Sequence, residues 1–295
     1  MYAITGITGK VGGSLADALL AAGLPVRAVV RDAAKGDGWR ARGCEIAIAE
    51  MEDEEALTKA FAGAEAAFIL PPPEFDPEPG YPEARRVISV VRAALESARP
   101  DRVVCLSTIG ADAKEDNLLT QRTLMEQALV TLSMPVTFLR PGWFIDNAAW
   151  DVASARDEGV IRSFLRPLDK RFAMVAATDV GVAAATLIRQ HWTGVRVVEL
   201  EGPARVSPND LAEAFAAALG RPVRAELVPH QEWEALFRAQ GMRNPLPRVR
   251  MLDGFNEGWI DFPANNGNRL KGKTSAAEVV AELVRVGLSS TSRGG

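Results

Sequence analysis

The chain of 295 residues is 47% hydrophobic and 24% charged, a typical globular composition that excludes wholesale disorder and a collagen-like repeat. Its formal net charge of −4 shows no excess of basic residues, so we expect no nucleic-acid partner. The two histidines and two cysteines match no metal-ligand spacing, so we expect no metal site (His191, His230, Cys44, Cys105).

The chain shows no pattern of a secretory signal or a membrane span. The segment after Met1 reads as a strand, and no apolar run reaches the roughly 18–20 residues that cross a bilayer. We therefore expect a cytoplasmic protein with no membrane partner.

The first half of the chain alternates short apolar strands with helices. The predicted strands are residues 3–5, 25–30, 45–49, 66–70, 102–107 and 136–139. The predicted helices are residues 13–22, 54–61, 82–98 and 118–132. Near-continuous apolar strands that alternate with helices indicate a parallel sheet with both faces covered. Right-handed crossovers then make that sheet doubly wound.

The second half has weaker signals. Residues 173–177 and 195–200 are predicted strands, and Thr178 or Asp179 is predicted to cap a helix that runs to residue 190. A helix at 208–219 follows Ser207 and Pro208, and Ser275 begins a capping box before the last helix. Between these lie a predicted strand at 222–228 and helices at 232–240 and 249–260, and the end, 288–295, is predicted to fray.

These elements predict an α/β fold. We expect a Rossmann-type doubly wound parallel sheet in residues 1–148 and a smaller C-terminal α/β substrate domain in residues 149–295. Residues 173–200 are expected to return to the first domain. The proline-rich acidic segment 71–82 is expected to be a stiff surface loop, either a lid or a solvated edge.

Residues 5–12 (TGITGKVG) space three glycines as G-x-x-G-x-x-G between the first strand and the first helix. Gly6 permits a tight turn, Gly9 lets the backbone approach a pyrophosphate, and Gly12 lets the helix pack closely on the sheet. The helix N-terminus offers free N–H groups to phosphates. We predict a dinucleotide site here, the alternative being a turn that binds nothing. The residues assigned to this site are Gly6, Ile7, Thr8, Gly9, Lys10, Val11 and Gly12.

The end of the second strand distinguishes the two nicotinamide cofactors. An acidic residue there binds a ribose hydroxyl, whereas an arginine accommodates a 2′-phosphate. Arg31 follows this strand and Lys35 lies close behind, so we predict NADP, with NADPH preferred over NADH. Two alternatives stay open. Asp32 could bind the ribose hydroxyl, and Arg31 could be a solvated charge with no role in cofactor binding.

Further cofactor contacts are expected where the other strands end, because open α/β sheets bind ligands at that edge. Ser107 and Thr108 are candidates for hydrogen bonds to the nicotinamide ribose or the substrate oxygen, although strand-end hydroxyls are common. The other candidates for the cofactor surface are Glu50 and Met51 at the adenine, with Leu70, Pro71, Pro72 and Pro141 along the cofactor.

With these residues the chain resembles the NmrA-like family of atypical short-chain dehydrogenases/reductases, and especially its NADPH:quinone reductase members. The resemblance rests on residues 5–12, 26–31 (VRAVVR), 104–107 (VCLS), 139–147 (LRPGWFIDN), 178–180 (TDV) and 219–223 (LGRPV). It implies binding of NADP(H). The family includes both reductases and redox sensors that bind the cofactor without turning it over.

The proton relay of ordinary short-chain dehydrogenases, a Tyr with a Lys four residues later, is missing from the sequence. Tyr2 and Tyr81 are the two tyrosines, and neither begins such a pair. Arg122 stands where many relatives have a lysine, but an arginine cannot serve as an acid. We consider a cofactor or substrate contact for Arg122, the alternative being a surface ion pair with Glu126.

Hydride transfer to a quinone-like acceptor needs positioning more than a proton relay. Trp143 and Phe144 follow the sixth strand and are predicted to wall the acceptor pocket, or else to be core aromatics. We therefore predict an NADPH-dependent reductase of an electrophilic small molecule, with Ser107, Arg122, Trp143 and Phe144 as pocket candidates. The alternative is a non-catalytic NADP(H) sensor that acts through a regulatory protein partner, and a homodimer is the other partner considered.

Overall fold

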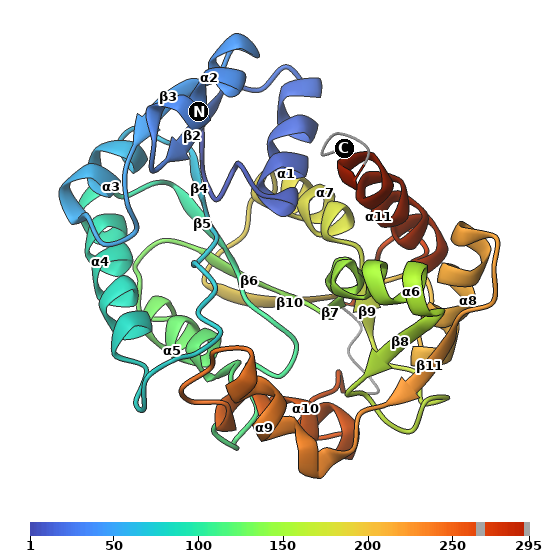
Figure 1. Cartoon of the computed structure of the whole chain (residues 1–295). Helices are drawn as coiled ribbons and strands as arrows, with labels where there is room; N and C mark the ends of the chain where they lie inside the picture. The colour runs from blue at the N-terminus through green and yellow to red at the C-terminus, as the bar shows by residue number, and fades with distance from the viewer. Residues whose placement is uncertain (264–268, 292–295) are drawn as a thin grey trace.

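The main sheet of the computed structural model has eight parallel strands in the order β12-β10-β6-β5-β4-β1-β2-β3 (Figure 1). The structure describes residues 1–263 and 269–291. Strands β1, β4 and β5 are buried along their whole length, as expected for a sheet covered on both faces. The strand bounds are β1 Tyr2–Thr5, β2 Val26–Val30, β3 Glu45–Ile48, β4 Ala66–Ile69, β5 Arg102–Leu106, β6 Val136–Pro141, β10 Val195–Glu201 and β12 Leu270–Lys271.

Helices cover both faces of this sheet. On one face α3 (Glu54–Phe61), α4 (Pro82–Ala98) and α5 (Thr120–Leu129) enclose an apolar core with residues such as Leu57 and Leu95. On the other face α1 (Lys10–Ala21) packs against α7 (Ala177–Ile188), with α2 (Ala33–Ala41) beside them. This arrangement confirms the predicted Rossmann-type doubly wound sheet.

The crossing of α1 and α7 is exceptionally close. A Cβ atom on Gly181 would lie 2.5 Å from the carbonyl oxygen of Val11 and 2.6 Å from Cβ of Ser14. Only a residue without a side chain therefore permits this separation of the two helices.

The smaller α/β unit is built from two short parallel sheets and several helices. Strand β11 (Arg224–Leu227) pairs with β8 (Val160–Ser163), and β7 (Trp143–Phe144) pairs with β9 (Met174–Val175). Its core contains the buried rings of Phe215, Trp233 and Phe237. The helical elements of this unit are η1 Ile145–Asp151, α6 Val152–Glu158, α8 Pro208–Leu219, η2 His230–Glu232, α9 Trp233–Ala239, α10 Leu246–Glu257 and α11 Ala276–Thr291.

Segment 173–200 divides between the two units. Strand β10 pairs with β6 in the main sheet, whereas β9 pairs with β7 outside it. The prediction that Thr178 or Asp179 caps α7 is wrong, because the helix begins at Ala177 without a side-chain cap. The Asp179 carboxylate instead accepts hydrogen bonds from the backbone N–H groups of Lys273 and Thr274, both at 2.8 Å.

Two other predicted caps are confirmed. Ser207 and Asp210 form a reciprocal capping box at α8, and Ser275 and Glu278 form one at α11. Helix α11 continues through Thr291, so the prediction that the chain frays from residue 288 is wrong for residues 288–291. Residues 292–295 of the predicted tail lie outside the described residues.

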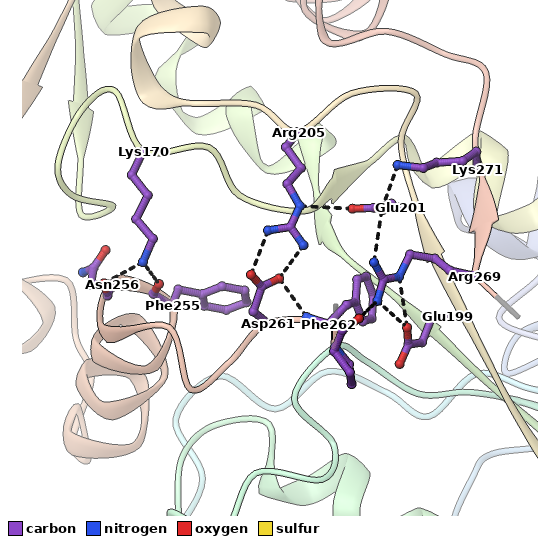
Figure 2. A network of polar contacts seen from close by, with 11 residues as sticks. Lys170, Glu199, Glu201, Arg205, Phe255, Asn256, Asp261, Phe262, Arg269 and Lys271 are labelled. Carbon is purple, nitrogen blue, oxygen red and sulfur yellow. Dashed lines mark hydrogen bonds and ion pairs between the residues drawn. The ribbon is translucent and has the colours of Figure 1, made fainter. Parts of the chain in front are cut away.

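Figure 2 shows a network of charged side chains around two buried glutamates, next to β12 at the edge of the sheet. Glu199 and Glu201 are both 4% exposed on β10. The guanidinium of Arg269 donates to Glu199 at 2.9 Å, and Nζ of Lys271 donates to Glu201 at 2.7 Å. Arg205 extends the network by a bidentate pair with Asp261 at 2.7 and 2.8 Å. The side chains of Arg269 and Lys271 therefore add to the backbone pairing that attaches this two-residue strand.

Candidate functional site

The glycine-rich loop after β1 has the backbone geometry of a ligand-binding turn. Gly6 has a φ of +64°, which favours glycine, and Leu70 packs 3.1 Å from the position of its missing Cβ. A Cβ atom on Gly12 would lie 2.3 Å from the Gly6 carbonyl oxygen, so its close contact is with the loop itself rather than with the sheet. A Cβ on Gly9 would meet only that same oxygen, at 3.5 Å. The outer side of Gly9 is therefore open to a ligand.

The N-terminus of α1 is suited to an anion. Gly9 is its N-cap without a side-chain hydrogen bond, and its first turn contains no acidic residue, so its first N–H groups can face a ligand. Ile7 and Val11 are buried in the core, which leaves their backbone for any ligand contact, whereas Thr8 is exposed. Lys10 is tied by its Nζ to Asp146 at 2.7 Å.

Two exposed cations, Arg31 and Lys35, follow the end of β2. The Asp32 carboxylate caps α2 by accepting the Ala34 N–H at 3.0 Å. The side chains of Arg31 and Lys35 are exposed and form no hydrogen bond or ion pair within residues 1–263 and 269–291. Glu50 and Met51 follow β3 next to this point, because the Ala49 N–H donates to the Val30 carbonyl at 2.9 Å.

Arg122 connects α5 to the end of β4. Its Nη2 donates to the carbonyl oxygens of Pro71 at 3.1 Å and Pro72 at 3.4 Å. The ion pair of Arg122 with Glu126 that helical spacing suggested is wrong, because Glu126 has other partners. Burial lowers the pKa of the Arg122 guanidinium.

A buried polar network at the ends of β5 and β6 has no signal in the sequence. The Ser107 hydroxyl donates to Glu126, and Arg140 clamps the same carboxylate through Nε at 2.9 Å and Nη2 at 2.6 Å. Asp112 adds a contact to Arg140 at 3.1 Å. Because the Ser107 hydroxyl uses its hydrogen in the bond to Glu126, the lone pairs of the Ser107 oxygen remain available to a ligand in the cavity described next.

A cavity of about 1030 Å³ opens at this edge of the sheet. Its lining includes six of the predicted site residues: Ser107, Thr108, Arg122, Pro141, Trp143 and Phe144. Helix α10 forms the part of the wall next to Trp143, whose ring meets Phe255 edge-on at 5.2 Å between centroids. The rest of the wall is largely apolar, which suits a flat organic ligand.

The proline-rich segment forms part of the cavity wall. Pro73 and Phe75 line the cavity, and the Asp76 carboxylate accepts the backbone N–H groups of Arg243 at 2.8 Å and Asn244 at 2.7 Å. These bonds attach the segment to the loop between α9 and α10. It therefore lies against the smaller unit and is more than a solvated edge.

One acid in the cavity wall, Asp151, has a raised pKa. Burial raises the pKa of the Asp151 carboxyl from 3.8 to about 6, although a backbone hydrogen bond from Arg162 and the Arg162 charge oppose the shift. A carboxyl group with such a pKa changes its charge near physiological pH. The sequence gives no signal for this residue.

The two tyrosines lie away from the cavity. The Tyr2 hydroxyl donates to Glu65 at 3.0 Å, and the Tyr81 hydroxyl donates to the Asn117 carbonyl at 2.9 Å. Burial raises the pKa of Tyr81 to about 12.

No helix in the described part of the chain is long and apolar enough to cross a membrane, and the same residues hold no metal-binding group of three or more His, Cys, Asp or Glu.

Comparison with known proteins places these features in context. The model of the NmrA-like family matches residues 2–249. NAD(P)H azoreductase of Xenophilus azovorans is 27% identical over 260 residues, which cover 87% of this chain and 85% of the relative. Quinone oxidoreductase 2 of Escherichia coli strain K12 is 26% identical over 293 residues, 97% of this chain and 99% of the relative.

Two solved structures share the fold. The NADPH-dependent quinone oxidoreductase of Escherichia coli complexed with NADPH has a TM-score of 0.78 at 24% identity and covers 96% of this chain and 99% of its own. The triphenylmethane reductase of Citrobacter sp. complexed with NADP(H) has a TM-score of 0.78 at 21% identity, with 96% and 100% covered.

Proposed function

The chain belongs to the NmrA-like family, and on that premise we propose that it is an NAD(P)H oxidoreductase that reduces a quinone-like or other electrophilic small molecule. The observation that carries this proposal is the cavity of about 1030 Å³ at the carboxyl ends of β5 and β6, the sheet edge that also carries the glycine loop after β1. The relatives support it, since their names describe quinone, azo-compound and triphenylmethane reductases.

We assign the cofactor to the edge of the sheet that holds the glycine loop. The open side of Gly9 and the uncapped N-terminus of α1 fit a pyrophosphate. Arg31 and Lys35, which pair with none of the described residues, fit the 2′-phosphate of NADPH. The bound cofactor would supply a hydride. Along the cofactor we place Glu50, Met51, Leu70, Pro71, Pro72, Thr108 and Pro141, which follow the strands of the same edge.

The cavity walls would hold the acceptor. Trp143 and Phe144 provide flat apolar surfaces, and Ser107 offers lone pairs to a ligand hydroxyl or amide. Reduction of a quinone by hydride needs one more proton. Neither Tyr2 nor Tyr81 reaches the cavity, so we propose that water supplies that proton without a Tyr-Lys relay.

The experiment is stopped-flow oxidation of enzyme-bound NADPH by a panel of quinones. We expect at least one acceptor to accelerate the oxidation in a saturable manner. Tight NADPH binding without acceleration by any acceptor would contradict the proposal and favour the redox-sensor alternative.

The cofactor preference is tested separately. Arg31→Ala should weaken NADPH binding about ten- to a hundredfold while leaving NADH binding within about twofold, since only NADPH carries the 2′-phosphate. Arg40→Ala on the exposed surface of α2, whose partner is Asp37, is the matched control. Equal losses for both cofactors would overturn the preference for NADPH.

A further inference from the structure

Arg248 is a charged side chain in the apolar wall that α9 and α10 give to the cavity. It is partly buried on α10, and its guanidinium lies 4.2 Å from the ring centroid of Phe237 and 6.0 Å from that of Trp150. Its Nη1 donates a hydrogen bond to the sulfur of Met242 at 3.7 Å. Within the described residues Arg248 forms no ion pair with a carboxylate. Thioether sulfur is a weak acceptor, so most of the five N–H donors of this group lack a strong partner.

The other arginines around the cavity have acidic or carbonyl partners. Arg162 lines the same cavity and pairs with Glu158, and Arg140 at its edge is clamped by Glu126 and Asp112. Arg122 donates to two carbonyl oxygens beside the predicted cofactor path. Arg248, on the α10 wall, differs from Arg162 and Arg140 because no acid among the described residues compensates its charge. It differs from Arg122 because no carbonyl oxygen among those residues accepts its N–H donors. Burial lowers the pKa of its guanidinium, as expected when desolvation has no counter-charge.

The setting of Arg248 favours a bound anion. Aromatic rings hold the guanidinium by cation–π contact and restrict its orientation without using its N–H donors. A carboxylate, sulfonate or phosphate in the cavity would accept hydrogen bonds from those N–H groups. The surroundings are poorly hydrated, and charge-assisted hydrogen bonds are strongest in such an environment. The apolar wall beside it would hold the remainder of a flat ligand.

We propose that Arg248 is an anion subsite of the acceptor cavity, and that the preferred acceptors are planar aromatic or quinoid molecules with an anionic substituent. This inference rests on the proposed reductase function and specifies its substrate class. If Arg248 only covered apolar surface, the charge of the ligand would not affect its affinity.

Binding is measured first, because it needs no hydride transfer. The probes are 2-naphthalenesulfonate and its neutral counterpart 2-naphthol, titrated by calorimetry against the NADPH-loaded protein. Arg248→Gln should weaken the sulfonate about ten- to a hundredfold and change 2-naphthol by less than about twofold. Arg248→Lys should recover part of the sulfonate affinity and provides a second variant if the Gln protein folds poorly.

The matched control is Arg250→Gln on the same helix, an exposed residue whose guanidinium donates to the Asp116 carbonyl at 3.4 Å. It removes the same charge from the protein and should leave both affinities unchanged. Equal losses of sulfonate and naphthol in Arg248→Gln would overturn the proposal, as would a loss of NADPH affinity, which would assign the guanidinium to the cofactor.

Turnover provides the second readout. The ratio of kcat/KM for 1,2-naphthoquinone-4-sulfonate to that for 1,2-naphthoquinone should fall about tenfold or more in Arg248→Gln and stay constant in Arg250→Gln. Selective sulfonate binding without turnover of either quinone would contradict the reductase function and leave the anion subsite standing. Turnover with an unchanged ratio would overturn the subsite alone.

Discussion

Replacing Asp151 by Asn should stabilise the protein at neutral pH. Burial raises the pKa of this carboxyl from 3.8 to about 6, so the folded state holds its proton more tightly than the unfolded state. Between these two pH values the folded protein is protonated and the unfolded chain is not. The contribution of Asp151 to stability is therefore most favourable below 3.8, falls as pH rises, and is constant above about 6.

The size of the effect follows from the shift. About two pKa units at about 1.4 kcal/mol each give a penalty of about 3 kcal/mol at pH 8, and about half of it at pH 5. Asp151 also precedes the N-terminus of α6, where a negative charge is favoured by about 0.3–1 kcal/mol. We therefore expect Asp151→Asn to raise the free energy of unfolding by about 2 kcal/mol at pH 8 and by clearly less at pH 5.

The assay is urea unfolding followed by tryptophan fluorescence at both pH values. The matched control is Asp157→Asn, where an exposed carboxylate pairs with Arg156 and has a lowered pKa, so no gain is expected. A destabilised Asp151→Asn protein at pH 8, or a gain that is equal at both pH values, would refute the reasoning from burial.

Three further outcomes are expected. Gly12→Ala places a Cβ 2.3 Å from the Gly6 carbonyl oxygen, so NADPH affinity measured by fluorescence should fall at least about tenfold, and an unchanged affinity would disprove the role of the close contact. Arg269→Met leaves Glu199 buried without its partner and should cost about 3–5 kcal/mol in urea unfolding, whereas a loss below about 1 kcal/mol would contradict this. Trp143→Ala should raise KM for the acceptor while NADPH affinity stays constant. A loss of NADPH affinity at an unchanged acceptor KM would instead indicate that Trp143 contacts the cofactor.

The sheet could be predicted because its information is local. Each central strand is a short apolar run, and the glycine spacing marks the turn after β1, so the alternation and the doubly wound topology follow from the sequence. Helix α2 was not predicted because Gly36 and Gly38 weaken its pattern. It forms because Asp32 caps it, and Gly36 packs on the sheet where a Cβ would lie 2.9 Å from Ile46.

The acceptor side of the site could be predicted only in part, because its interactions join residues far apart in the chain. Helical spacing suggests that Glu126 pairs with Arg122, whereas in the folded protein Glu126 binds Arg140 and Ser107 from neighbouring strands. The raised pKa of Asp151 depends on burial by the assembled cavity. Neither effect is visible in a local pattern.

The two parts of the site therefore differ in how freely they can change. In the proposed function the glycine loop would bind the cofactor through backbone atoms, at a turn where an added side chain collides, as Gly12 shows with a Cβ position 2.3 Å from the Gly6 oxygen. The acceptor cavity is lined by side chains from β5, η1 and α10, and replacing one of them changes its shape or charge without disturbing that turn. Such a division is consistent with relatives of about 26–27% identity that are named for quinone and azo-compound reduction. It leads us to expect that acceptor choice in this chain is set by cavity residues such as Arg248 and Trp143, and that exchanging them redirects specificity while NADPH affinity is kept.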